Sequence, residues 1–244
     1  MLSDIWTITQ KEWKELLRQR GGLRGGFLGV LVFMGVLGIL MPIQFGPEWV
    51  QSGSQMITWV WFPFLLVSGV IADSFAGERE RHTLETLLAS RLSNKAILFG
   101  KVAAAISYGW GLSMTCMLLG LITVNIVHGK GQILMYRWEI GLATIVLSLL
   151  VASLSSSLGI LVSLRASTVR QAQQTFSLAF MLFFIPMMLL PVLPQAWQGR
   201  LMMWVVNSNF SAIIPASMLI LFILDILLIA AAMARFQRAK LILD

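Results

Sequence analysis

The sequence predicts an all-α integral membrane protein with six transmembrane helices, and three observations lead to that prediction. Hydrophobic residues make up 57% of the 244 residues and charged residues only 12%, whereas about a quarter of the residues in a soluble domain are charged. Six long intervals carry no charge except for Asp225 in the last one, and each can hold the roughly 20 apolar residues that cross the hydrocarbon core. The basic residues gather in alternate connections, which is typical of membrane topology rather than of nucleic-acid binding.

Residues 1–26 are predicted to form a cytoplasmic amphipathic elbow helix ahead of a six-span membrane domain of residues 27–244. Apolar residues that include Trp6 and Trp13 recur at helical spacing, and Lys11 and Lys14 fall between them. Such a helix lies in the membrane interface with its Trp rings at headgroup level and its bases toward anionic lipid. The alternative is a solvated basic leader.

The six spans and their short connections occupy nearly the whole length of the chain. We expect them at about 27–45, 56–74, 97–127, 140–164, 174–194 and 212–234. When Lys101 is counted with the connection before the third span, 15 Lys and Arg residues fall on one side and 3 on the other, so the positive-inside rule places both termini in the cytoplasm. We therefore expect a multi-pass protein of a prokaryotic plasma (inner) membrane, with any nucleotide hydrolysis on another chain.

The connection between the second and third spans contains a short amphipathic helix. A run of alternating charge precedes Leu84, Leu87 and Leu88, whose spacing of i, i+3 and i+4 puts them on one helical face. An exposed apolar stripe framed by charges is suited to enter a groove on a partner protein. The alternative is an interfacial helix that rests on lipid.

This connection resembles the signature of the type 2 ABC transporter permease family, the membrane-spanning subunits of ABC exporters. The resemblance rests on the residues Gly77, Glu78, Arg79, Glu80, Arg81, Thr83, Leu84, Glu85, Leu87 and Leu88. An amphipathic entry helix, six spans and a polar-aromatic segment before the last span are also similar to that family. Two residues depart from its pattern, because His82 stands where Gly is frequent and Arg91 where Pro is common.

The resemblance implies that this connection contains a coupling helix that seats in a cleft of an ATP-binding subunit. By position, Glu78, Arg79, Glu80, Arg81 and Glu85 would make polar contacts to that subunit, and Leu84, Leu87 and Leu88 would be the apolar anchor. It also implies that ATP and Mg belong to the partner and that a second permease copy or paralogue completes the path. The sequence has no Gly-x-x-x-x-Gly-Lys-Ser/Thr run, and this chain is therefore expected to bind no cofactor and to be no enzyme.

Three polar residues within the predicted spans are candidates for a transport path. Asp225 is the one acid deep inside a span, where a carboxylate requires water, a partner or a proton. It either contacts a substrate or proton, or holds helices together as a hydrogen-bonded acid. Ser153 and Ser156 belong to a serine-rich fourth span, where small hydroxyl residues favour close helix packing as well as a polar path.

The segment between the fifth and sixth spans is predicted to lie at the outer membrane surface. Trp197, Leu201 and Trp204 share one face at i, i+4 and i+7. In the resembling family re-entrant helices occupy this position and shape the exit of the path, so these residues are candidates for an outer gate. The alternative is an aromatic-belt anchor.

Three functions from different classes remain after these observations. The leading one is the permease subunit of an ABC exporter that forms its path as a dimer. The second is a transporter or channel driven by an ion gradient, for which Asp225 is the one intramembrane acid. The third is a mechanical transmitter that moves an extracytoplasmic partner. A metal centre is not expected, because no His/Cys/Asp/Glu cluster has ligand spacing.

Overall fold

The computed structural model describes residues 1–20, 27–52, 54–189, 192–207 and 210–236, and these residues form helices without a strand. The all-α prediction is confirmed. In chain order the helices are α1 Leu2–Arg20, α2 Phe27–Gly35, the π-helix η1 Val36–Leu40, α3 Met41–Phe45, α4 Glu48–Gln51, α5 Ser54–Glu80, α6 Leu84–Ala89, α7 Asn94–His128, α8 Trp138–Ser163, α9 Val169–Leu189, α10 Gln195–Asn207 and α11 Phe210–Arg235.

Five helical segments of the described chain are long and apolar enough to cross a membrane. They coincide with the first, second, third, fourth and sixth predicted spans. Their bounds are Leu28–Phe45, Ile57–Glu80, Asn94–His128, Trp138–Ser163 and Ile213–Arg235. The fifth predicted span overlaps α9, which begins with a polar turn and is not among the five. Residues 190–191 of that span lie outside the described part of the chain.

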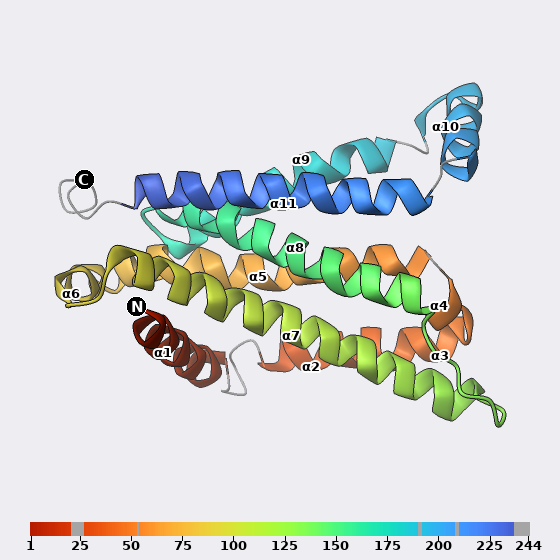
Figure 1. Ribbon diagram of the computed structural model, residues 1–244, viewed down its shortest axis with the longest axis horizontal. Helices are drawn as coiled ribbons and strands as arrows, with labels where there is room; N and C mark the ends of the chain where they lie inside the picture. Colours follow the sequence, from red (N-terminus) through yellow and green to blue (C-terminus); the bar gives the residue numbers. More distant parts are fainter. Residues whose placement is uncertain (21–26, 53, 190–191, 208–209, 237–244) are drawn as a thin grey trace.

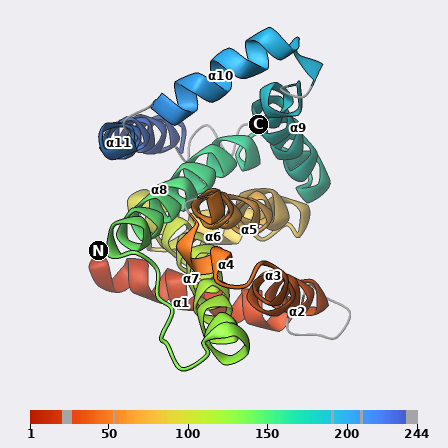
Figure 2. The ribbon, with the colours of Figure 1, turned by 90° about the vertical axis from the view of Figure 1, so that its right-hand side faces the viewer.

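The long helices run side by side, and two others cross them at the ends (Figures 1 and 2). α7 lies between the α2–α3 segment on one side and α5 and α8 on the other, α9 packs on α5, and α11 packs on α8. α1 crosses α7 at the end of the bundle that also carries α6, and α10 lies at the opposite end. We call these the α6 end and the α10 end.

The first span changes its helical pitch where it meets a proline. Pro42 has no N–H to donate to the carbonyl four residues earlier, which belongs to Gly38 in the π-helix η1. The Thr123 hydroxyl of α7 donates to that Gly38 carbonyl at 2.8 Å instead. Because a free carbonyl in hydrocarbon is costly, this contact fixes α7 against the π-turn.

α5 and α8 form the closest pair, and small residues of α8 allow it. The Ser155 hydroxyl donates to the Phe64 carbonyl at 2.9 Å. The Ser163 hydroxyl donates to the Ala72 carbonyl and accepts from the N–H of Ala76, at 3.0 and 2.9 Å. A side chain at Gly159 would overlap Ile71. Interhelical hydrogen bonds and close backbone approach therefore hold the centre of the bundle.

One cluster of buried apolar residues joins the α6 end to the spans. It draws residues from α1, α5, α6, α7, α8 and α11, among them Ile8, Phe75, Leu84 and Ile97. Because protein interiors are close-packed, a displacement of one residue of this cluster forces the neighbouring side chains to shift.

Candidate functional site

The signature residues at the end of α5 do not form a separate surface loop. Gly77 to Glu80 are the last turn of α5, a tight turn follows, and α6 begins at Leu84. The Thr83 N–H donates to the Glu78 carbonyl at 2.9 Å, which closes the turn. His82 has φ +56°, a left-handed conformation that Gly adopts more easily than other residues. The position where the resembling family often has Gly is thus the position that favours it.

The apolar face of α6 points into the protein. Leu84 is 6% exposed and belongs to the buried cluster, and Leu87 packs against that cluster. The exposure expected of this stripe is therefore not observed for Leu84, because the protein's own core covers it, whereas Leu87 is half-buried. The contact of these leucines with an ATP-binding subunit stays a prediction. The side chain of Leu88 lies outside the described part. Glu85, Thr86 and Ala89 make the exposed face of α6.

Glu78 is likewise turned inward, where it joins a buried charge cluster. It is 4% exposed and accepts from Lys101 Nζ on α7 at 3.0 Å and from Lys11 Nζ on α1 at 3.3 Å. Lys101 is 2% exposed and also donates to Glu12 Oε1 at 2.9 Å and to the Ser74 carbonyl at 2.8 Å. We call Lys11, Glu12, Glu78 and Lys101 the α1 clamp. Within this chain the Glu78 carboxylate thus pairs with Lys101 and Lys11, and its expected contact with an ATP-binding subunit stays a prediction.

The α1 clamp satisfies the ammonium group of Lys101, whereas Glu78 Oε2 is buried without a hydrogen bond among the described residues. An ammonium group has three donors, and Lys101 directs them to two carboxylates and a carbonyl. Burial lowers the pKa of Lys11, but the carboxylates of Glu78, Glu12 and Glu15 outweigh it and the pKa is raised above 10.5. The Lys11 contribution to stability is therefore complete below pH 10.5 and is lost as the pH rises through the raised pKa.

The remaining charged signature residues tie α5 to the connection between α8 and α9. Arg79 donates to the carbonyls of Ala166 at 2.8 Å and Leu164 at 3.2 Å. Glu80 accepts from the Val169 N–H, at the start of α9, at 3.0 Å. Gly77 is packed so tightly that a side chain would overlap Asp73, whose carboxylate lies 3.6 Å from Arg81.

This end of the bundle thus combines an internal and an external part. Glu78 and Arg79 hold α1, α7 and the α8–α9 connection together, while Arg81, His82, Glu85 and Thr86 are exposed. A groove lined by Lys11, Glu15, Thr86, Leu87 and Ser90, among others, runs beside α6. α6 shares its buried Leu84 with the apolar cluster that includes residues of α1, α5 and α7.

Sequence reasoning missed the acceptors that hold Lys101. It counted Lys101 among the basic residues of a connection, but the ion pairs join it to residues 23 and 89 positions away. No local pattern identifies such a pair. The one available signal was an acid at Glu78 and a base at Lys101 on helices expected to be neighbours.

Asp225 is buried between α11 and α8. It is 4% exposed, and Ser153 of α8 is its neighbouring hydroxyl, but neither carboxylate oxygen has a hydrogen bond of good geometry within the described structure. Ser156 is fully buried, and its hydroxyl also lacks a partner among the described residues. The structure therefore brings Asp225 and Ser153 together, at a distance from α6 along the bundle.

The aromatic segment lies on α10. Trp197 is 59% exposed, with the Arg200 guanidinium 5.8 Å above its ring. The side chains of Leu201 and Trp204 lie outside the described part, so their shared face stays a prediction. Among the described residues, no group of three or more His, Cys, Asp or Glu side chains could hold a metal ion.

Comparisons with known proteins identify the class of the chain. A family model described as ABC-2 type transporter matches residues 3–206. The ABC transporter permease protein NatB of Bacillus subtilis (strain 168) is 27% identical over 137 residues, which make up 51% of this chain and 35% of that protein. The similarity thus spans about a third of the relative's length.

Proposed function

The chain belongs to the ABC-2 type transporter family, and from this premise we propose that it is the permease subunit of an ATP-binding-cassette exporter. In this proposal two copies, or one copy and a paralogue, enclose the path, and separate ATPase subunits bind ATP and Mg. The six spans, cytoplasmic termini and inner-membrane location predicted from the sequence belong to the same proposal.

The observation that carries the proposal is α6 at the end of α5. Leu84 anchors this short helix in the core that includes the spans, and Glu85 and Thr86 face outward. The exposed polar face, rather than the leucine stripe, then contacts the ATPase. Nucleotide-driven closure would press α6 toward the bundle, and the α1 clamp and Arg79 would carry the motion to α1, α7 and α8. Binding energy of the partner thus shifts the population between conformations.

The second permease copy finds support in the outer surface of α11. Leu219, Ile220, Phe222 and Leu227 of this helix are each more than half exposed. Apolar residues of this kind are covered by lipid or by another membrane helix.

Co-purification tests the proposal directly. The tagged chain is expressed with candidate ATPase subunits, and Glu85→Lys/Thr86→Arg is compared with the wild type. We expect the ATPase to co-purify with the wild type and to be lost from the variant, since two large cations replace the acid and the hydroxyl that the exposed face of α6 offers to a partner. Glu48→Lys, an exposed acid of α4 at the other end of the bundle, is the matched control and should keep the ATPase.

The outcome is interpretable only if each variant reaches the membrane. An ATPase that stays bound to Glu85→Lys/Thr86→Arg would refute the assignment of the α6 face. Leu84→Asp is unsuitable as a test, because it places a charge in the core and disrupts the fold whether or not a partner docks.

A transporter or channel driven by an ion gradient is the second candidate. It is favoured by the buried Asp225, whose carboxylate has no hydrogen bond of good geometry among the described residues. In vesicles that contain this chain without any ATPase, such a protein would move ions, and Asp225→Asn would abolish the flux. If the wild-type chain moves no ions without an ATPase, the ion-gradient function is excluded and the ATP-driven function remains. A mechanical transmitter would bind the ATPase as the exporter does but would move no solute.

A further inference from the structure

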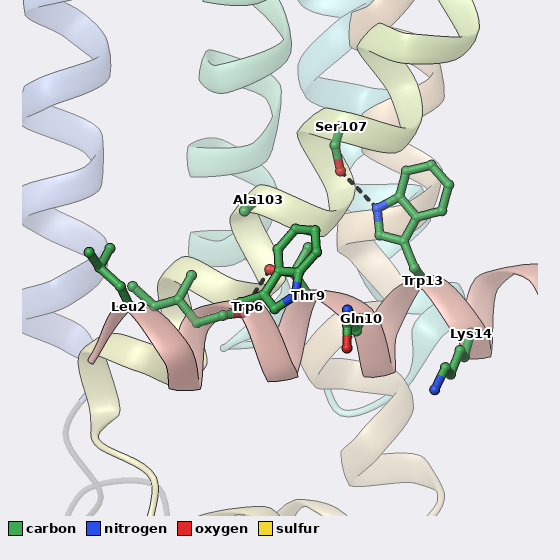
Figure 3. Close-up of a pocket in the computed structure, with 9 residues that line it drawn as sticks. Leu2, Trp6, Thr9, Gln10, Trp13, Lys14, Ala103 and Ser107 are labelled. Carbon is green, nitrogen blue, oxygen red and sulfur yellow. Dashed lines mark hydrogen bonds between the residues drawn. The ribbon is translucent and has the colours of Figure 1, made fainter.

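A groove of about 800 Å³ separates α1 from α7 on the side away from the α1 clamp. Its volume falls in the range of small-molecule binding sites. α1 contributes most of the lining, and Ala103 and Ser107 of α7 form the floor (Figure 3). None of these residues has a role in the proposed coupling to an ATPase.

Close contacts between α1 and α7 fix the shape of the groove that lies beside them. Gly100 lets α1 approach α7 closely, because a side chain there would overlap Ile8. Thr9 donates to the Gly100 carbonyl at 3.2 Å, and Trp13 Nε1 donates to the Ser107 hydroxyl at 2.9 Å. These bonds fix the indole of Trp13 as one wall. Trp6 lies two helical turns earlier, about 10 Å along α1, and is the other wall.

The lining changes from apolar to basic across α1. In Figure 3 the rings of Trp6 and Trp13 extend along α7, whereas the Lys14 amine points to the opposite side of α1. Trp6 is 64% exposed and Leu2 81% exposed, so large apolar surfaces stand open beside the charge. Lys14 has no ion pair within the described residues, whereas its neighbour Lys11 is held in the α1 clamp.

A ligand that matches this surface has an apolar tail and an anionic head. α1 runs across the spans at one end of the bundle, where the membrane surface lies if the five apolar segments cross it. Phospholipids supply both parts at that depth, and Trp and Lys side chains favour it. A polypeptide would also have to satisfy its backbone, for which the apolar lining offers little.

We propose that the groove between α1 and α7 binds one anionic phospholipid molecule, with an acyl chain against Trp6, Ala103 and Ser107 and its phosphate at Lys14. The lipid then fills the space between α1 and the third span and holds α1 in the position in which the α1 clamp forms. The test of this site requires no ATPase and no transported substrate, so it can fail or succeed separately from the proposed transport function.

Native mass spectrometry of the purified full chain tests the proposal. The chain in detergent is titrated with phosphatidylglycerol or with phosphatidylcholine, and the first bound lipid is quantified. We expect the chain to bind phosphatidylglycerol about five-fold more tightly than phosphatidylcholine. This is the gain in affinity that one lysine provides near an anionic headgroup. Lys14→Gln should remove the preference for phosphatidylglycerol and should leave the binding of phosphatidylcholine unchanged. Lys130→Gln, an exposed lysine beyond α7, should leave it unchanged.

A second variant tests the acyl part of the site. Ala103→Leu fills the floor and should lower the occupancy of phosphatidylglycerol about ten-fold. Gly111→Leu on the same helix, where an added carbon meets nothing within 4 Å, should have no effect.

Three results would overturn the proposal. The first is that Ala103→Leu binds phosphatidylglycerol to the same occupancy as the wild type. The second is that the wild type binds phosphatidylglycerol and phosphatidylcholine equally well. The third is Ala103→Leu that changes the oligomeric state while lipid occupancy stays the same, since the groove would then be a contact between copies of the chain. If Ala103→Leu fails to fold, Lys14→Gln on the surface still decides between a headgroup site and none.

Discussion

Lys101 joins three helices through one side chain. Its ammonium group lies within 3.0 Å of acceptors on α1 and α5, while its own backbone belongs to α7. A buried ion pair adds little to stability when compared with well-packed apolar residues, but removal of one partner leaves a charge without compensation. The α1 clamp should therefore be sensitive to single changes and tolerant of paired ones.

Lys101→Met should destabilise the protein by about 3–5 kcal/mol, because Glu78 and Glu12 lose their buried shared partner and keep only the half-exposed Lys11. Thermal unfolding in detergent measures the effect. Lys101→Met/Glu78→Gln removes both charges and should recover a large part of the loss. An unfolding midpoint of Lys101→Met equal to that of the wild type would contradict this account of the α1 clamp.

His82 holds the turn before α6 at a backbone cost. Its φ of +56° is the left-handed region, which costs a non-glycine residue roughly 1–2 kcal/mol. We expect His82→Gly to stabilise the folded chain slightly and His82→Val to destabilise it, since β-branched residues fit this region worst. The same unfolding assay separates the two. A stabilising His82→Val would show that the turn does not have this conformation.

At the scale of elements, hydrophobic pattern predicted the helices but not the direction in which their faces point. Leu84 and Leu87 share a face, as their spacing indicates, yet that face meets the core of the same chain. Periodicity identifies an apolar stripe and cannot tell an internal neighbour from an external one. The π-helix at Val36–Leu40 was also not predicted, because it depends on Pro42 together with Thr123, a residue of another helix.

The α5–α8 pair offers a test of close packing. Gly159→Ala places a methyl group into Ile71 and should destabilise the protein by about 1–3 kcal/mol, since the helices have to separate to admit it. Gly111→Ala on α7, with open space around it, should be neutral or slightly stabilising because Ala favours helix. Equal effects of the two substitutions would mean that α5 and α8 are not in contact at Gly159.

For the whole molecule, the sequence predicted a helical membrane protein of a known transporter class, and both statements are confirmed. Composition and charge-free intervals suffice for this level, because the bilayer imposes a length and an apolar surface on every span. The number of copies, the direction of transport and the substrate depend on contacts with other molecules. None of these contacts leaves a pattern that one chain shows by itself.

Orientation can be tested with the single native cysteine removed. Cys116 is fully buried, so Cys116→Ser provides a background on which Glu85→Cys and Lys130→Cys report on opposite ends of the bundle. The positive-inside rule predicts that a membrane-impermeant maleimide labels Lys130→Cys in intact cells and Glu85→Cys only after lysis. The reverse pattern of labelling would invert the proposed topology.

α7 is a single rod that reaches from one end of the molecule to the other. Its 35 residues contain no proline and rise about 52 Å, well beyond the hydrocarbon thickness of about 30 Å. Lys101 fastens the rod near its first turns, and Asn125 fastens the loop at its far end through two hydrogen bonds to Leu134 at 2.8 Å. If α7 tilted by about 5° around the end at Asn125, the end near Lys101 would move by about 4.5 Å. In the proposed exporter, the length of α7 would make it a lever arm, in which a small angular change at α1 becomes a displacement of several ångströms at the other end.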